Sequence, residues 1–257
     1  MGAKIYQNKK YIAFFLIPAF VFMLIFLYYP FIQNIINSFQ HIKYMGTAAD
    51  KWNAPFYKNY LEIFKDPKML IALKNTGIMI IATIVGEVGL AIVLSLLVSN
   101  IKKGAGFFRV VYFFPIVISA TALGLLFNLV FLYDKGMINQ LLQLIGVLDA
   151  GKNKLIDWKA TYPMFTMLVP VIWQYVGFYF IILLTGLSGI PEDLYEAAEI
   201  DGASKLQQVR YVTLPLLRNS ICTCVVLAVT GALKVFDLPW TMFVNGMSNT
   251  WLTGTYM

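Results

Sequence analysis

The sequence predicts an all-α membrane protein that crosses the bilayer about five times. Of its 257 residues, 59% are hydrophobic and only 13% are charged, roughly half the charged share of a soluble domain. Five apolar runs each approach the ~20 residues that a helix needs to span the hydrocarbon core. Polar and apolar residues do not alternate within them, which argues against barrel strands. The runs comprise residues 11–29, 77–98, 110–132, 164–187 and 221–244.

The first run follows a cluster of positive residues, Lys4, Lys9 and Lys10, as the apolar part of a secretory signal would. It is too long for such a signal, and no small-residue cleavage site follows it. We therefore interpret it as a retained span.

The net charge of +7 is assigned to lysines beside the spans, because no basic stretch with interleaved aromatic residues stands out. Membrane lipid is therefore an expected partner, and nucleic acid is not. The loops on one side of the membrane carry no fewer lysines than those on the other, so the positive-inside rule does not decide the orientation.

A membrane-embedded enzyme is the alternative class to a transporter. Against it, the spans hold no His-Glu or paired-Asp constellation, and the one histidine, His41, lies in an outer loop. No P-loop is present, so any ATP hydrolysis must come from a partner. Cys222 and Cys224 show neither metal-ligand spacing nor a disulfide framework, and we expect them to be packing residues. The sequence predicts neither catalytic residues nor a metal site.

Two polar stretches separate the apolar runs. Residues 30–68, with Trp52, Pro55 and Pro67, are expected to form an external loop with short helical pieces, and residues 133–162 form a second such stretch. No internal repeat divides the chain, so residues 1–257 are expected to form a single transmembrane domain.

The loop after the fourth run, residues 188–219, is polar yet patterned as two short helices. Pro191 fits the first helical position, and Glu192 and Asp193 favour the positive end of the helix dipole. Gly202 fits the end of this helix, because glycine adopts the left-handed C′ conformation without strain.

The second short helix of this loop is predicted to begin at Ser204, which forms a capping box with Gln207. Leu214 and Pro215 are expected to end it. The apolar residues of the pair suit docking into a groove on a partner. A helix pair that lies on lipid headgroups fits the pattern equally well. The apolar residues expected at the surface are Leu194, Ala197, Ala198, Leu206, Val209 and Val212.

The sequence of this loop resembles the EAA loop of ABC-importer permeases. Glu196-Ala197-Ala198 is followed at the family spacing by Gly202, and further on by Val212 and Leu214-Pro215, with Val in place of the usual Ile. The longer sequence resembles the carbohydrate branch of the family, the maltose-type permeases. It runs from Asp193 through Asp201-Gly202-Ala203 to Leu217. A polyamine, peptide or inorganic anion is the alternative cargo.

The resemblance implies a type I importer in a bacterial plasma membrane. Two permease subunits, usually different ones, would stand beside each other with two ATPase subunits below, and an extracellular binding protein would deliver the solute. The partner ATPases would bind ATP and Mg²⁺, so this chain needs no cofactor of its own. The loop would couple ATP hydrolysis to the spans, which requires a cytoplasmic loop and a cytoplasmic N-terminus. The implied coupling residues are Glu196, Ala197, Ala198, Asp201, Gly202, Leu206 and Pro215.

A second resemblance lies after the fifth run. Phe236-Asp237 and residues 244–246 through 255–256 resemble the stretch that precedes the last span of this family. The sixth span of the family core is not in the sequence, and a truncation is the favoured interpretation.

Ionisable residues within spans are costly, at ~2.5 to 3.5 kcal/mol for a charge at the centre, and are functional candidates. Glu87 lies in the second run, where a structural hydrogen bond to a neighbouring helix is the favoured interpretation. Lys234 and Asp237 lie three residues apart in the fifth run. Three residues apart on a helix, they can form an ion pair on one face, or they can contact the solute.

The segment from Trp173 to Tyr179 resembles the one that lines the sugar site of maltose-type permeases. Aromatic faces stack on a pyranose, and amide and hydroxyl groups bond its hydroxyls. The alternative role for each of these residues is ordinary side-chain packing between helices, without contact to the solute. The substrate-path candidates are Gln174, Tyr175, Gly177, Tyr179, Lys234, Asp237 and Trp240, with Asn128 as a weaker one.

Overall fold

The structure is a computed structural model and describes residues 9–43, 47, 49–101, 104–148 and 155–243. The chain divides into two compact units, residues 1–67 and 68–257. Within the described part of the chain, three helices are long and apolar enough to cross a membrane, or up to five if each of two bent helix pairs is one span. The predicted number of spans is therefore reached only when the bent pairs are counted.

The first unit contains one long helix that runs without interruption through Pro30. Its 29 residues, Lys10–Ser38, pass through a wider π-helical turn just before the proline. Pro30 then lies in the first turn of the next α-segment, where its missing N–H costs least. The predicted start of the outer loop at Pro30 is therefore wrong, and the helix ends at Ser38. The segments are α1 (Lys9–Met23), η2 (Leu24–Tyr28) and α2 (Tyr29–Ser38).

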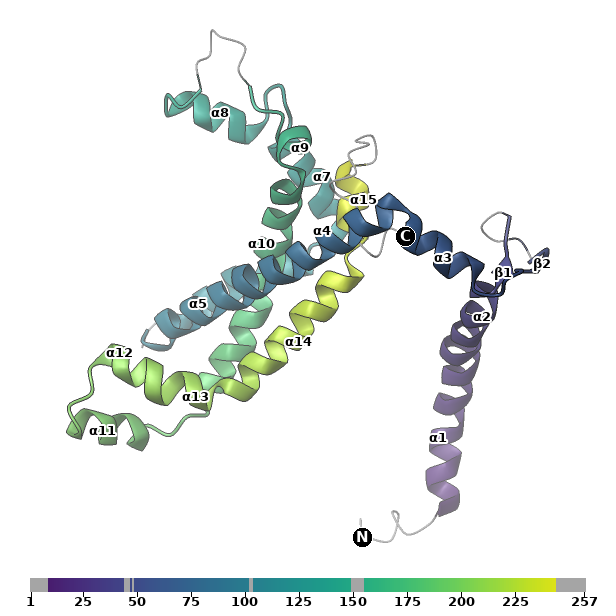
Figure 1. Ribbon diagram of the computed structural model, residues 1–257. Coiled ribbons are helices and arrows are strands. Elements are labelled where there is room, and N and C mark those ends of the chain that lie inside the picture. Colours follow the sequence, from purple (N-terminus) through teal and green to yellow (C-terminus); the bar gives the residue numbers. More distant parts are fainter. Residues whose placement is uncertain (1–8, 44–46, 48, 102–103, 149–154, 244–257) are drawn as a thin grey trace. The chain divides into compact units, whose positions relative to one another are not determined.

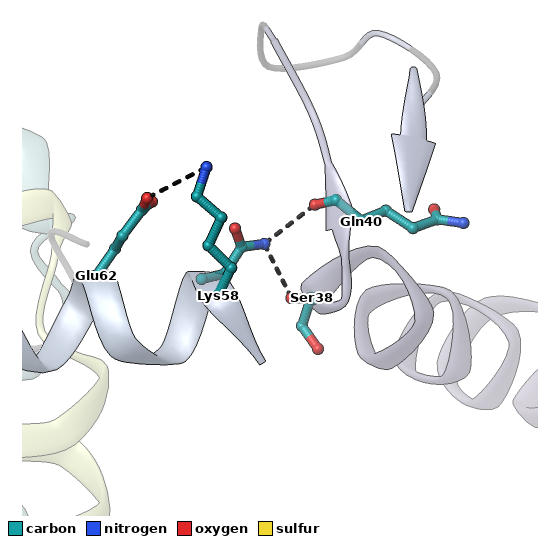
Figure 2. A network of polar contacts seen from close by, with 5 residues as sticks. Ser38, Gln40, Lys58 and Glu62 are labelled. Atoms are coloured by element: carbon teal, nitrogen blue, oxygen red, sulfur yellow. Dashed lines mark hydrogen bonds and ion pairs between the residues drawn. The ribbon is translucent and has the colours of Figure 1, made fainter. Parts of the chain in front are cut away.

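A small hairpin and a short helix follow this long helix, which agrees with a loop that contains helical pieces. Strands β1 (Gln40–His41) and β2 (Lys51–Trp52) pair antiparallel, and α3 (Lys58–Lys65) comes after them. The Asn59 side chain donates to the backbone carbonyls of Ser38 at 2.9 Å and Gln40 at 3.0 Å. These bonds tie α3 to the hairpin, while the Lys58–Glu62 pair at 3.6 Å lies along the helix (Figure 2).

The second span is a single helix of 33 residues, Pro67–Ser99, and begins ten residues before the predicted run at Gly77. In its first half, the helix itself provides an acceptor for the buried Thr76, whose hydroxyl donates to the Ala72 carbonyl at 2.8 Å. A π-helical turn at its centre contains Glu87. The segments are α4 (Pro67–Thr83), η3 (Ile84–Gly89) and α5 (Leu90–Ser99).

The third predicted run is not one straight helix. Its two halves, Ala105–Val117 and Ala120–Val130, meet at an angle of 96°. Pro115 cannot donate to the helix, and Ser119 in extended conformation caps a new one. The segments are α6 (Ala105–Phe113), η4 (Phe114–Val117) and α7 (Ala120–Val130), followed by α8 (Met137–Leu144) and α9 (Trp158–Thr161).

The fourth span, α10 (Pro163–Ser188), is the central helix of the second unit (Figure 1). It packs against α5, α6 and α14. Two buried clusters follow its length. One joins it to α4, α7 and α15, and the other joins it to η3, α5 and α14. Cys224 lies in the second cluster, as expected of a packing residue, whereas Cys222 is exposed.

The fifth predicted run is broken as well. Helix α14 ends at Lys234, because Val235 is extended, and a new helix begins at Asp237. A continuous helix would press the ring of Pro239 against the Val235 carbonyl, which explains the break. Its last predicted residue, Val244, lies outside the described residues. The segments are α14 (Arg218–Lys234) and α15 (Asp237–Phe243).

The loop between the fourth and fifth spans forms two short helices, as predicted (Figure 1). The first begins at Asp193 rather than Pro191. The second does not end at Pro215. A π-helical turn precedes the proline, and the helix continues past it to Leu216. A bend of 67° then leads into α14. The segments are α11 (Asp193–Ile200), α12 (Lys205–Gln208), η5 (Val209–Thr213) and α13 (Leu214–Leu216).

Candidate coupling loop and solute path

The turn between α11 and α12 depends on Gly202. Its φ of +78° is left-handed, the conformation expected of a glycine that ends a helix. The Gly202 N–H donates to the Glu199 carbonyl at 3.0 Å, and the Ala203 N–H donates to the Ala198 carbonyl at 2.9 Å. This pair of bonds is a Schellman motif, which confirms the predicted end of the first short helix.

The second short helix starts with the predicted capping box. The Gln207 side chain accepts from the Ser204 N–H at 2.7 Å. Beside it, the Lys205 ammonium hydrogen-bonds the Glu199 carboxylate and so closes the turn from the outside. This bond holds the pKa of Glu199 below its ordinary value of 4.5.

The helix pair exposes large apolar side chains on a polar loop. Ile200 is 87% exposed and Leu206 is 78% exposed, and Leu194 is also exposed. Glu196, Ala197, Asp201 and Pro215 are exposed too, whereas Ala198 is half-buried. The expected exposure of Val209 and Val212 is wrong, because both are half-buried. Ile200 was missed, although its place at the helix end could have suggested it.

A cleft of about 800 Å³ lies between the loop and the spans. Its walls come from the end of α5, the start of α6, the end of α10 and the two short helices. Two residues of its lining, Tyr195 and Thr213, share a hydrogen bond between their hydroxyls at 3.1 Å, and this bond connects α11 to η5. The loop is thus a preformed helix pair and not a flexible connection. The charged residues along the cleft are Arg109, Glu192, Glu196, Glu199 and Lys205.

Three of the candidate path residues on α10 face into the subunit. Gln174 is 5% exposed, and its side chain donates to the Ile118 carbonyl at 2.9 Å. Gly177 lets the backbone of α6 approach, since a β-carbon there would lie 1.7 Å from the Tyr112 carbonyl oxygen. Tyr179 is 3% exposed and lies beside Glu87 of the second span.

Glu87, on the π-helical turn of the second span, lies at the packing contact between this turn and α10. Glu87 itself is 2% exposed. Its burial beside Tyr179 agrees with a structural role for Glu87, and the hydrogen bond to a neighbouring helix stays a prediction.

The other candidates are accessible. On α10, Tyr175 and its neighbour Trp173 are exposed. At the break between α14 and α15, Lys234, Asp237 and Trp240 are exposed. Trp240 stacks on Phe236, with ring centroids 5.6 Å apart.

The possible ion pair between Lys234 and Asp237 does not form. The helix ends between them, so the two side chains no longer lie one turn apart on one face.

Asn128, the weaker candidate, joins two elements. Its side-chain amide donates to the Thr241 carbonyl at 3.2 Å, and its oxygen accepts from the Lys159 ammonium at 2.7 Å. Thr241, Lys159 and Ile118 were not predicted, since nothing in the local sequence marks partners so far apart along the chain. Within the described ranges, no three His, Cys, Asp or Glu side chains gather to hold a metal ion.

A bundle of apolar helices with polar residues between them, and an exposed helix pair held rigidly beside it, defines a membrane transport subunit. The chain belongs to the family of binding-protein-dependent transport system inner membrane components, whose family model matches residues 88–257. It is an ABC transporter permease, a transport subunit. The predicted resemblance to this family is confirmed.

Individual relatives agree with this assignment. The chain is 34% identical to the probable ABC transporter permease protein YurN of Bacillus subtilis, over 93% of this chain and 81% of the relative. It is 32% identical to the arabinooligosaccharides transport system permease protein AraP of Halalkalibacterium halodurans, over 94% of this chain and 74% of the relative. The fold matches a crystal structure of a bacterial alginate ABC transporter in complex with alginate pentasaccharide-bound periplasmic protein, with a TM-score of 0.79 and 22% identity over 98% of this chain and 81% of that one.

Proposed function

We propose that this permease forms part of the path by which an ATP-driven importer carries a sugar or oligosaccharide across a bacterial plasma membrane. The names of relatives support the class of solute, since one of them serves arabinooligosaccharide transport and the matched structure belongs to an alginate transporter. The observation that carries the proposal is the rigid helix pair of α11 and α12, with its exposed apolar tip.

In this proposal, α11 and α12 dock in a cleft of an ATPase subunit. Ile200, Leu206 and Leu194 supply the apolar contacts, because exposed large apolar side chains on a polar loop are typical of an interaction surface. The Glu196 carboxylate meets a basic residue of the ATPase, and Gly202 sets the angle between the two helices. Because both helices are fixed to the spans, movement of the ATPase dimer is transmitted to α10 and α14 as a rigid-body motion.

The accessible aromatic and polar residues of α10 and α15 form this subunit's share of the solute path. Tyr175 and Trp240 offer aromatic faces to a sugar ring, and Asp237 accepts hydrogen bonds from its hydroxyls. Lys234 lies across the helix break and offers donors. These four residues are exposed in the structure, as a path that a second permease completes would require.

The remaining partners follow from the same proposal. A second permease, different from this one, completes the path, and two ATPase subunits bind ATP and Mg²⁺. A binding protein outside the membrane delivers the solute, as supported by the periplasmic protein in the matched alginate transporter. ATP is a cytoplasmic ligand, so α11 and α12 lie in the cytoplasm. Four crossings separate them from the N-terminus, which therefore lies on the same side.

The experiment is purification of the complex through a tag on this chain, followed by an ATPase assay with the binding protein and a panel of saccharides. We expect an ATP-hydrolysing subunit to co-purify, and one saccharide-loaded binding protein to stimulate it. Stimulation only by a polyamine, a peptide or an inorganic anion would overturn the sugar assignment, and absence of an ATPase would overturn the whole proposal.

A further inference from the structure

The break in the third span leaves a backbone carbonyl without its usual partner. In a continuous helix, the Ala122 N–H would donate to the Ile118 carbonyl four residues earlier. Here the Ser119 hydroxyl accepts from the Ala122 N–H at 3.2 Å, and Ile118 is extended, with ψ of 130°. The Ala122 N–H is therefore bonded to the Ser119 cap of α7, and the Ile118 carbonyl does not accept from it as it would in a continuous helix.

Gln174 supplies the replacement from another helix. Its side-chain amide donates to the Ile118 carbonyl at 2.9 Å, across 56 residues of sequence, and is nearly fully buried. A buried carbonyl with no donor costs about 1–3 kcal/mol, and the hydrocarbon core holds no water to replace the donor. The bond thus stabilises the bend between the two halves of the third span, at the start of α7.

Helix α7 is in turn joined closely to α15. A β-carbon on Gly124 would lie 1.9 Å from the Thr241 hydroxyl oxygen, so the two helices touch at this point. Asn128 bonds the Thr241 carbonyl and is itself held by Lys159. By contrast, the helix is interrupted between α14 and α15 at the extended Val235, and α15 packs most extensively against α7. The direction of α15 is therefore set by α7 more than by α14.

We propose that Gln174 is a positioning residue for the solute path: it holds Ile118, and through the corner of α7 it places α15 and the accessible Asp237 and Trp240. Gln174 therefore does not contact the solute, and affects it only through the positions of the residues that line the path. The role of α15 in this inference rests on the proposed function, but the mechanical link from Gln174 to Asp237 does not.

The test measures the link without transport. Reporter cysteines are placed on either side of the helix break, Lys234→Cys or Asp237→Cys, in the complete complex with Cys222→Ser and Cys224→Ala. The rate of modification by a hydrophilic thiol reagent is compared with and without Gln174→Met, which keeps the side-chain length and removes the donor. We expect the rate at position 237 to change about tenfold and the rate at position 234 to stay the same.

Two further variants separate positioning from general loosening. Leu183→Ala removes buried volume on α10 in the cluster that contains no residue of α7 or α15, without removing a hydrogen bond, and should leave both rates unchanged. Asn128→Ala breaks the next link and should reproduce the effect of Gln174→Met, so it provides the same test if the Gln174 variant does not assemble. An unchanged rate at position 237, an equal change at both positions, or the same change with Leu183→Ala would overturn the inference. Protection of the cysteine at position 237 by solute is a separate result that bears on the proposed function alone.

Discussion

The carbonyl oxygen of Tyr112 occupies the place where a side chain on Gly177 would begin, because a β-carbon built there would lie only 1.7 Å from it. Helices α6 and α10 therefore meet backbone to backbone. Small residues at such crossings allow close packing of membrane helices, where dispersion replaces the hydrophobic effect as the driving force.

We expect Gly177→Ala to force these helices apart and to destabilise the complex by about 1–3 kcal/mol, as overpacking does. Thermal unfolding of the purified complex measures the effect. Gly231→Ala is the matched control, since nothing lies within 4 Å of the β-carbon that it adds. Equal stability of the two variants would show that α6 can move away at no cost.

Gly202→Val should abolish uptake while the subunit stays in the membrane. The left-handed backbone at this position costs a residue with a β-carbon about 1–2 kcal/mol, and a branched side chain raises the strain, so the angle between α11 and α12 should change. Gly202→Asn is the control, because asparagine tolerates the left-handed region, and it should retain much of the uptake. Solute uptake and the amount of subunit in membranes are measured together. Normal uptake by the valine variant would remove the role of the turn.

Glu196→Lys should also abolish uptake without loss of the subunit from the membrane. Its carboxylate is exposed on α11 and makes no hydrogen bond or ion pair with the residues that the structure describes, so reversal of its charge is expected to act on a partner. Glu62→Lys reverses a charge in the other unit and should transport normally. Similar uptake by the two variants would argue against an ATPase contact at Glu196.

A hydrogen bond between Glu87 and Tyr179 is expected to contribute about 0.6 kcal/mol, the average measured between membrane helices, and at most about 1.7 kcal/mol. Tyr179→Phe leaves the buried carboxyl without its partner, whereas the double variant Glu87→Leu with Tyr179→Phe removes both groups. A double-mutant cycle on the unfolding of the purified complex isolates the coupling. The bond would be of no consequence if the two single changes were simply additive.

The ion pair between Glu199 and Lys205 should respond to pH only in the acid range. Because the pair lowers the pKa of Glu199, its contribution is complete above the ordinary value of 4.5 and is lost as pH falls through the lowered value. A carboxyl carbon signal of Glu199 in the NMR spectrum should therefore titrate at a lower pH than in the Lys205→Met variant. Identical titration of the two would mean that the pair does not form in solution.

Periodicity and turn chemistry predicted the elements that depend on local sequence. The end of α11 at Gly202 and the capping box at Ser204 are set by the chemistry of one to four neighbouring residues, and both are found as predicted. The number of spans follows from hydrophobic length alone, which bounds how far a segment reaches but not whether it is straight.

Prolines caused the errors in the spans. Pro30 and Pro215 were expected to end helices, but each follows a π-helical turn that removes the need for its N–H. Pro115 and Pro239, in contrast, stand at real breaks. Composition does not distinguish the two outcomes, because the same residue type, proline, stands both within continuous helices and at breaks.

The roles of the polar residues on α10 depend on tertiary structure. Gln174, Gly177 and Tyr179 were grouped by sequence as path candidates, yet they lie on the side of α10 that contacts α6, η3 and the broken span. Only Tyr175 of that group is accessible. Which face of a wholly apolar helix points inward is set by its neighbours, and the sequence of one helix does not contain that information.

The most direct test of the account is the side of the membrane on which α11 ends. A single cysteine replaces Ile200, the most exposed apolar residue of the loop, in a chain with Cys222→Ser and Cys224→Ala, and vesicles of both orientations are treated with an impermeant maleimide. We predict labelling only where the cytoplasmic face is open, and protection when the ATPase subunits are bound. Labelling from the outside, or no protection by the ATPase, would contradict it.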